Sequence, residues 1–187
     1  KAAFPLAPGF YLRAEQARAH ALRKRYDVRG EGLMIGVSWR SANPVVGVER
    51  SAPLTLWDDL LTRPGCVFVN LQYGEVADEL AETRERLGVT IHRDAEIDPL
   101  ACMDDWAAQI AAMDLVISVD NSTVQLSGAL GIPTWTLLTR VPEWRWLMDG
   151  DESPWHPLMR VFRQPAPGDW ATVFTDVLRA LDRELGG

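Results

Sequence analysis

Short apolar runs alternate with longer amphipathic stretches along most of the chain. The runs are rich in Val, Ile and Leu, whereas the stretches between them carry apolar residues at helical spacing. The runs predict strands at 33–38, 66–71, 89–92, 115–119, 133–138 and 159–162. The stretches predict helices at 13–26, 53–61, 75–87, 103–113 and 124–130, and a closing helix capped by Asp169. This alternation indicates an α/β domain with a doubly wound, mainly parallel six-stranded Rossmann-like sheet and helices on both faces.

The most informative stretch is 114–131, where a predicted strand leads directly into a predicted helix. Between them stand four polar residues, Asp120, Asn121, Ser122 and Thr123, and Gly131 ends the helix. In an open α/β sheet, ligands bind where the carboxyl ends of strands meet helix N-termini. The free N–H groups and the positive dipole end of such a helix favour an anion, so this turn is a candidate phosphate site.

The same turn also has a purely structural interpretation. Ser122 and Gln125 fit a capping box, in which Ser caps the helix and Gln reaches back to the backbone. Such a cap contributes roughly 0.5–2 kcal/mol. The two interpretations are compatible, because a capped helix can still offer N–H groups to a phosphate.

The other strand tips face the same crevice if the sheet is Rossmann-like. They bring in Trp39, Arg40 and Ser41 after the first strand, and Gln72 and Tyr73 after the second. Arg40 and the nearby Arg50 are candidate partners for a pyrophosphate, although surface arginines are common without any ligand.

Composition narrows the classes of function. The chain has 187 residues, 47% of them hydrophobic, which suits one domain with a substantial core. A formal net charge of −7 without a basic tract argues against nucleic acid or an anionic membrane as a partner. No apolar run reaches the roughly 18 residues of a membrane span. Residues 1–12 read as an interdomain linker and 13–187 as one domain, so we expect a piece of a longer cytoplasmic protein.

The sequence lacks the motifs of several common binding and catalytic sites. The chain has no G-x-G-x-x-G, no Walker pattern and no G-x-S-x-G. His20, His92 and His156 fall in separate elements, which predicts no metal site and no bound cofactor. Cys66 and Cys102 are far apart and are expected to be buried thiols in a reducing compartment.

A tryptophan-rich segment at 140–158 fits no regular pattern. It contains Trp144, Arg145, Trp146 and Trp155 among prolines and glycines. One interpretation is a satellite hydrophobic cluster under a long loop. The other is a wall at the sugar and acceptor end of the crevice, because indole faces suit sugar rings.

Eight short motifs together resemble a known family. In chain order they read IGVSW at 35–39, RSAPL at 50–54, FVNLQ at 68–72, MDLVISVD at 113–120, LSGALGIPTW at 126–135, PEWRW at 142–146, SPW at 153–155 and FRQ at 162–164. The chain is similar over nearly its whole length to the C-terminal half of heptosyltransferase-like glycosyltransferases. It resembles most the bacterial members that carry tetratricopeptide repeats.

The resemblance implies a GT-B architecture, in which two Rossmann-like domains face each other and the C-terminal one holds a nucleotide-sugar. It implies an inverting, metal-independent transfer to a protein or glycan, with the catalytic base in the N-terminal domain. The implied phosphate contacts come largely from backbone N–H groups of Asn121, Ser122, Thr123 and Leu126. Arg50, followed by Ser51 in the same motif, is the implied charged partner, and Gln72 and Tyr73 would lie near the donor.

One departure from the family affects the expected activity. Gln125 stands where relatives carry His, and Gln cannot hold a proton or a charge near neutral pH. Two alternatives therefore stand beside the transferase: a non-catalytic nucleotide-sugar-binding or scaffolding module, and a GT-B-fold epimerase acting on a free nucleotide-sugar.

Overall fold

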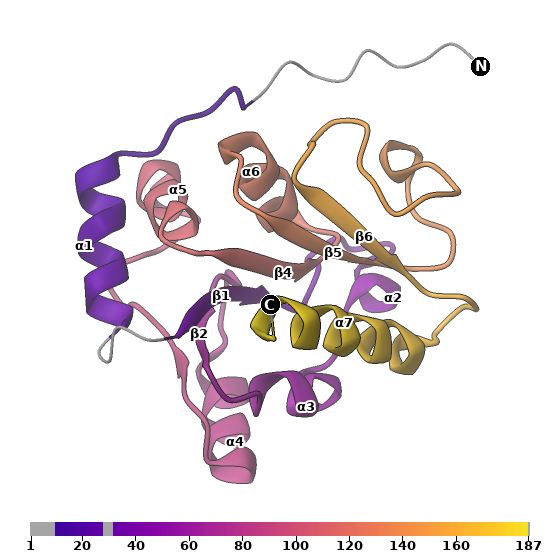
Figure 1. The fold of residues 1–187 in the computed structure, drawn as a ribbon, viewed down its shortest axis with the longest axis horizontal. Helices are drawn as coiled ribbons and strands as arrows, with labels where there is room; N and C mark the ends of the chain where they lie inside the picture. Colours follow the sequence, from indigo (N-terminus) through magenta and orange to yellow (C-terminus); the bar gives the residue numbers. More distant parts are fainter. Residues whose placement is uncertain (1–9, 28–31, 187) are drawn as a thin grey trace.

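The computed structural model describes residues 10–27 and 32–186, so most of the predicted linker, residues 1–9, lies outside the described residues. The described strands form one six-stranded sheet in the order β3-β2-β1-β4-β5-β6 (Figure 1). Their bounds are β1 Leu33–Ser38, β2 Cys66–Asn70, β3 Ile91–His92, β4 Leu115–Val119, β5 Thr134–Leu138 and β6 Met159–Arg163. Every neighbouring pair in this sheet is parallel, which confirms the predicted fold class.

The helices also follow the predicted order, with ends that differ by a few residues. Their bounds are α1 Gln16–Tyr26, α2 Gly47–Arg50, α3 Asp58–Leu61, α4 Ala77–Leu87, α5 Met103–Ala111, α6 Ser122–Leu130 and α7 Trp170–Leu185. Two 3-10 turns, η1 Leu54–Trp57 and η2 Trp144–Trp146, complete the set of described helical elements. The single turn α2 was missed because four residues are too short to show a helical period.

The sheet separates two hydrophobic layers. Helices α1, α5 and α6 cover one face, and α3, α4 and α7 cover the other (Figure 1). Side chains of a strand alternate between these layers, so Met34 packs with α1 and α5 while Ile35 and Val37 pack with α3 and α7. At Gly36 a Cβ would come within 2.3 Å of Leu71, which shows why this position holds no side chain.

The strand order places a topological switch point between β1 and β4. From β1 the chain moves outward to β2 and β3, and it returns to β4 before it continues to β5 and β6 on the other side. At such a point the two flanking connections diverge and leave a crevice at the carboxyl edge of the sheet. The tips of β1 and β4 are therefore the part of the fold in which a ligand site is expected.

Two smaller expectations meet different outcomes. Cys66 and Cys102 are free but only partly buried, so the prediction of buried thiols is wrong. Gly131 ends α6 in a left-handed conformation, with φ of 75°, as the sequence predicts, and Gly88 ends α4 in the same way, with φ of 69°. Within the part of the chain that the structure describes, no helix is long and apolar enough to cross a membrane.

Candidate functional site

The turn from β4 into α6, residues 120–125, is organised by Asn121. Its Oδ1 accepts a hydrogen bond of 2.9 Å from the N–H of Thr123, which makes Asn121 the N-cap of α6. Its Nδ2 donates to Ser38 Oγ at 2.7 Å and to the Arg40 carbonyl at 2.9 Å. One side chain thus caps the helix and also ties the tip of β4 to the tip of β1 across the switch point.

The predicted capping box is therefore wrong. Ser122 is the first helical residue instead of the cap, and Gln125 lines the pocket in front of the turn. The N-cap is thus one residue earlier than predicted. The side chain of Asn121 also bonds to the neighbouring strand tip, and a capping pattern within one helix does not include such contacts.

The free N–H groups of the turn are fewer than the resemblance implied. Only the first four N–H groups of a helix lack a partner within it. The N–H of Thr123 is already used by Asn121, and that of Leu126 lies beyond this first turn. The side chain of Leu126 is buried in the core. Ser122, which is exposed at the helix start, is the residue best placed to donate.

A pocket of about 240 Å³ lies in front of this turn. Its lining contains eight residues predicted to be in the site, Ser41, Arg50, Tyr73, Asp120, Asn121, Ser122, Gln125 and Arg145. Asn43 is the lining residue that sequence reasoning missed. Its Oδ1 accepts from the N–H groups of Val45 and Val46 and so shapes the loop before α2. We call this the switch-point pocket.

The charges of the switch-point pocket are paired. Arg50 Nη1 lies 3.0 Å from Asp120 Oδ2, and Arg50 Nη2 lies 3.8 Å from Glu143 Oε2. Glu143 also forms an ion pair with Arg145. Two arginines are thus held by two carboxylates, and both side chains of the Arg50–Asp120 pair are largely buried, with 16% and 7% exposed.

Burial raises the pKa of Asp120 above its ordinary value, while the positive charge of Arg50 acts in the opposite direction. Glu143, as a second carboxylate nearby, adds to the raised pKa of Asp120. In the structure Glu143 joins both arginines, and no pattern in the sequence indicated this.

Two further pockets extend the switch-point pocket along the carboxyl edge of the sheet. One, of about 510 Å³, shares Ser41 and Tyr73 with it. The next, of about 290 Å³, lies at the ends of β2 and β3 and shares Tyr73 and Leu100 with the second. These shared residues make the three pockets one adjoining cleft across the tips of β3, β2, β1 and β4.

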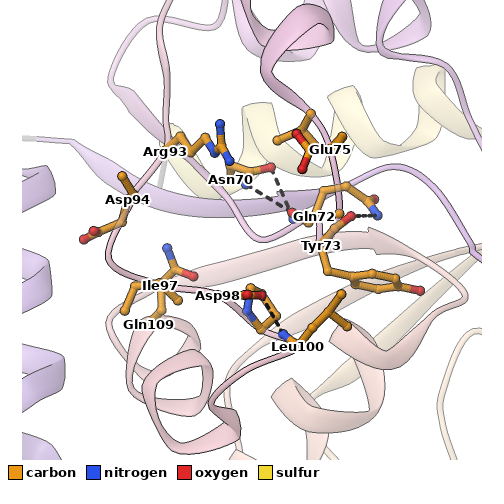
Figure 2. A pocket seen from close by; sticks show the side chains of 14 residues that line it. Asn70, Gln72, Tyr73, Glu75, Arg93, Asp94, Ile97, Asp98, Leu100 and Gln109 are labelled. Atoms are coloured by element: carbon orange, nitrogen blue, oxygen red, sulfur yellow. Dashed lines mark hydrogen bonds between the residues drawn. The ribbon is translucent and has the colours of Figure 1, made fainter.

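Figure 2 shows the pocket at the tips of β2 and β3. Tyr73 and Leu100 lie on one side, and Arg93 and Asp94 lie opposite them. Most of the labelled residues that were not predicted from the sequence are polar. They include Asn70, Arg93, Asp94, Asp98 and Gln109. Asn70 ends β2 and Arg93 follows β3, so the rule that ligands bind at strand tips would have found both.

Two other predicted residues, Gln72 and Ser51, form hydrogen bonds with the chain that follows β1. Gln72 is buried, and its Oε1 accepts hydrogen bonds from Ser38 Oγ and from the N–H groups of Trp39 and Arg40, at 2.7–3.0 Å. Gln72 thereby fixes the path of the chain after β1. Ser51 does the same for Ser41, whose N–H donates to Ser51 Oγ at 3.1 Å.

Two predicted contacts after β1 are directed elsewhere. Arg40 lines the second pocket, but its guanidinium forms an ion pair with Glu79 of α4 at 3.0 Å. Trp39 is fully buried in the core, and its Nε1 donates to the same Glu79 at 2.9 Å. Trp39 is therefore a core residue and not a ligand contact.

The tryptophan-rich segment divides between the two interpretations. Trp146 is 2% exposed and packs in a small cluster with Val124, Leu138, Met159 and Val161, so its assignment to a sugar wall is wrong. Trp144 is 71% exposed. Its ring meets that of Trp155 edge-on, at a centroid distance of 6.0 Å, and Arg145 lies over it at 5.6 Å.

The described residues contain no group of three or more His, Cys, Asp or Glu side chains placed to hold a metal ion. The positive charge of the cleft comes from arginines and from the N-terminus of α6. The fold and the site together define a Rossmann-like α/β domain with a polar, arginine-lined pocket at its switch point.

Known proteins resemble this chain in sequence and in fold. No family model matches the chain. The chain is 39% identical over 183 residues to Protein FlbA of Caulobacter vibrioides. The matched region covers 96% of this chain and 30% of FlbA. Its fold matches E. coli ADP-heptose lps heptosyltransferase II with a TM-score of 0.60 and 16% identity, over 92% of this chain and 54% of the other.

A second solved structure, a glycosyl transferase of family 9 from Veillonella parvula, matches with a TM-score of 0.61 and 14% identity, over 93% of this chain and 46% of that one. The chain thus has the Rossmann-like fold found in these glycosyltransferases. It spans about half the length of the two solved chains and less than a third of FlbA.

Proposed function

We propose that this chain is the donor-binding domain of an inverting, metal-independent glycosyltransferase that uses a nucleoside-diphosphate-sugar as substrate and no cofactor. The observation that carries the proposal is the switch-point pocket, in which the N-terminus of α6 and two arginines face one cavity. Similarity of fold to two glycosyltransferase structures supports the same function. We further propose a protein or glycan as the acceptor.

The cleft suggests how such a donor would lie. The diphosphate would accept from the N–H of Ser122 and pair with Arg50 and Arg145. An arginine fork suits phosphate oxygens, and a helix N-terminus adds favourable dipole charge. The nucleoside would extend toward Tyr73 and the polar pocket of Figure 2, where amide and carboxylate groups offer partners to a base and a ribose. Charge stabilisation of the leaving diphosphate by these groups replaces the metal ion.

Transfer also needs a base that takes the acceptor proton, within about 2.6–3.2 Å or through one water. The two carboxylates beside the switch-point pocket, Asp120 and Glu143, are both paired with arginines. We therefore propose that the base comes from a second, N-terminal Rossmann-like domain across the cleft, in a cytoplasmic protein that also carries tetratricopeptide repeats. On this proposal the chain alone binds the donor but does not transfer sugar.

Gln125 favours one other function. It lines the switch-point pocket as a neutral side chain, and the arginines there are already balanced by carboxylates. A module that binds a nucleotide-sugar without turning it over would have this arrangement. Measured transfer by the full-length protein decides between the two functions.

Binding is tested first, by thermal shift and then calorimetry with UDP, GDP, ADP and CMP and their sugars. We expect one nucleoside diphosphate to bind, and Arg145→Gln to weaken it by roughly 10- to 100-fold, because a charge-assisted contact contributes roughly 1.5–3 kcal/mol. Arg179→Gln, which removes an exposed arginine from α7, is the matched control and should bind as the wild type does. A panel without any binding, or equal affinity of both variants, would refute the proposed site.

A further inference from the structure

The exposure of Trp144 is unusual for this chain. It is 71% exposed, whereas Trp39, Trp57, Trp106, Trp135, Trp146 and Trp170 are all buried. An exposed indole offers a large, rigid apolar face that a ligand can cover. Together Trp144 and Trp155 form an edge-to-face pair at the surface, which we call the Trp ledge.

The Trp ledge is held in place by the surrounding chain. Trp155 Nε1 donates to the Arg145 carbonyl at 2.9 Å, which joins the two ends of the segment. Arg163 of β6 donates to the Trp146 carbonyl at 3.2 Å, and the buried Trp146 side chain anchors the η2 turn. Trp144 is therefore exposed on a fixed turn, and its exposure does not come from a loose loop.

Backbone strain accompanies this turn. Leu147, directly after η2, has φ 54° and ψ 176°. Only glycine adopts this region readily, and such conformations persist where the surrounding structure enforces them, often at functional sites. The chain thus keeps an unfavourable backbone at the residue that ends the turn carrying Trp144.

The Trp ledge adjoins the switch-point pocket through Arg145. This arginine lies over the Trp144 ring and also lines the pocket with Asp120, Ser122 and Gln125. Its partner Glu143 contacts Arg50 in turn. Arg145 therefore links the Trp144 ring to the pocket in which a phosphate would lie at Ser122.

We propose that the Trp ledge is the subsite for the sugar ring of the nucleotide-sugar donor. The apolar C–H face of a pyranose would pack on the Trp144 indole, and its hydroxyls would meet Glu143 and Arg145. The inference rests on the proposed function and adds where the transferred group lies and what recognises it.

The shape of the cleft indicates at which end the nucleoside and the sugar of the donor would lie. The two larger pockets lie on the β2 and β3 side and enclose room for a nucleoside, whereas the ledge is open to solvent. A sugar that is to be transferred must stay accessible to a second substrate, so it belongs at the open end. Charged neighbours at the ledge, Glu143 and Arg145, suit hydroxyl groups better than a wholly apolar partner surface.

The experiment separates the sugar from the nucleotide. Calorimetry compares the best-binding nucleoside diphosphate with its sugar conjugates, for instance UDP with UDP-glucose and UDP-N-acetylglucosamine, or GDP with GDP-mannose. We expect Trp144→Ala to weaken the sugar conjugate about tenfold, a typical effect of losing one stacked ring, and to leave the bare nucleotide unchanged. Trp144→Phe, which keeps an aromatic face, should recover part of this loss.

Leu185→Ala is the matched control, because it removes an exposed apolar side chain at the far end of α7. It should change neither affinity. Sugar conjugates that bind no tighter than the nucleotide, or that bind Trp144→Ala as well as the wild type, would overturn the ledge and leave the proposed function intact. Equal weakening of nucleotide and conjugate would also overturn it. A wild type that binds no nucleotide would refute the proposed function itself.

Discussion

The 120–125 turn and the tryptophan-rich segment lie on the same edge of the sheet, yet they are built by different means. The turn joins a strand to a helix, and its key side chain, Asn121, bonds to the neighbouring strand tip. The segment joins β5 to β6 through irregular backbone and is held by a few side-chain contacts with carbonyls. Of the four polar residues predicted in the turn, Asp120, Asn121 and Ser122 line the switch-point pocket, whereas Thr123 is buried.

Within the tryptophan-rich segment, residue type alone did not predict which side chains are buried. Trp144 and Trp146 stand two positions apart, but 71% of the first and 2% of the second is exposed. A strand alternates faces in a known way, whereas an isolated 3-10 turn in a loop gives no period from which to predict a face. The same amino acid is therefore a surface residue at one position and a core residue at the other.

The largest expected effect tests this division. Trp146→Ala should lower the free energy of unfolding by about 3–5 kcal/mol, because it empties a buried site among Val124, Leu138 and Met159. Trp144→Ala should change it by less than about 0.5 kcal/mol, since its ring is mostly in solvent. Urea unfolding of the two variants measures both values, and each serves as the control for the other. Similar losses from both substitutions would contradict the division.

A smaller effect is expected at the ion pair that links the two regions. Arg50→Ala leaves Asp120 buried without its partner, and we expect a loss of about 3 kcal/mol. The Arg50→Ala/Asp120→Ala double variant should lose less than the sum of the single variants, because no unpaired charge remains. A double-mutant cycle by urea unfolding at pH 7 measures the coupling.

The pH dependence of Arg50→Ala gives a second measurement. Burial raises the pKa of Asp120 in the folded state, so this state binds its proton more readily than the unfolded chain does. The stability lost at pH 7 should therefore be partly recovered as the pH falls toward the ordinary carboxyl pKa. Additive single losses, or a deficit that grows in acid relative to the wild type, would show that Asp120 and Arg50 do not act as a pair.

The sequence predicted the fold better than it predicted the site. Strand runs such as 115–119 are fully buried and bounded by polar residues, so their period and ends were readable, and the tips that they define contain most of the switch-point pocket. The ion-pair network was not readable. Glu143 lies 93 positions after Arg50, and only the packing of the loop after β5 brings the two together.

Misplaced residues have a common cause. Trp39 and Leu126 stand in the sequence beside residues that line the cleft, but a strand tip and a helix direct neighbouring side chains to different sides. Trp39 and Leu126 face the core for this reason. A position at a strand tip can thus be predicted to lie near the cleft, while the side on which its side chain lies depends on how the backbone turns there.

The smallest expected effect distinguishes the two caps that were considered for α6. Asn121→Ala removes the helix cap and the two hydrogen bonds to the tip of β1, and we expect a loss of about 1–2 kcal/mol. Ser122→Ala should cost less than about 0.5 kcal/mol, because an exposed first helical residue has no capping role. Asn121→Asp keeps the acceptor for the N–H of Thr123 but cannot donate to the Arg40 carbonyl, so its stability should fall between Asn121→Ala and the wild type. Unfolding midpoints in urea, measured for all three variants, rank them. A Ser122→Ala loss as large as that of Asn121→Ala would restore the capping box and remove Asn121 as the residue that joins β4 to β1.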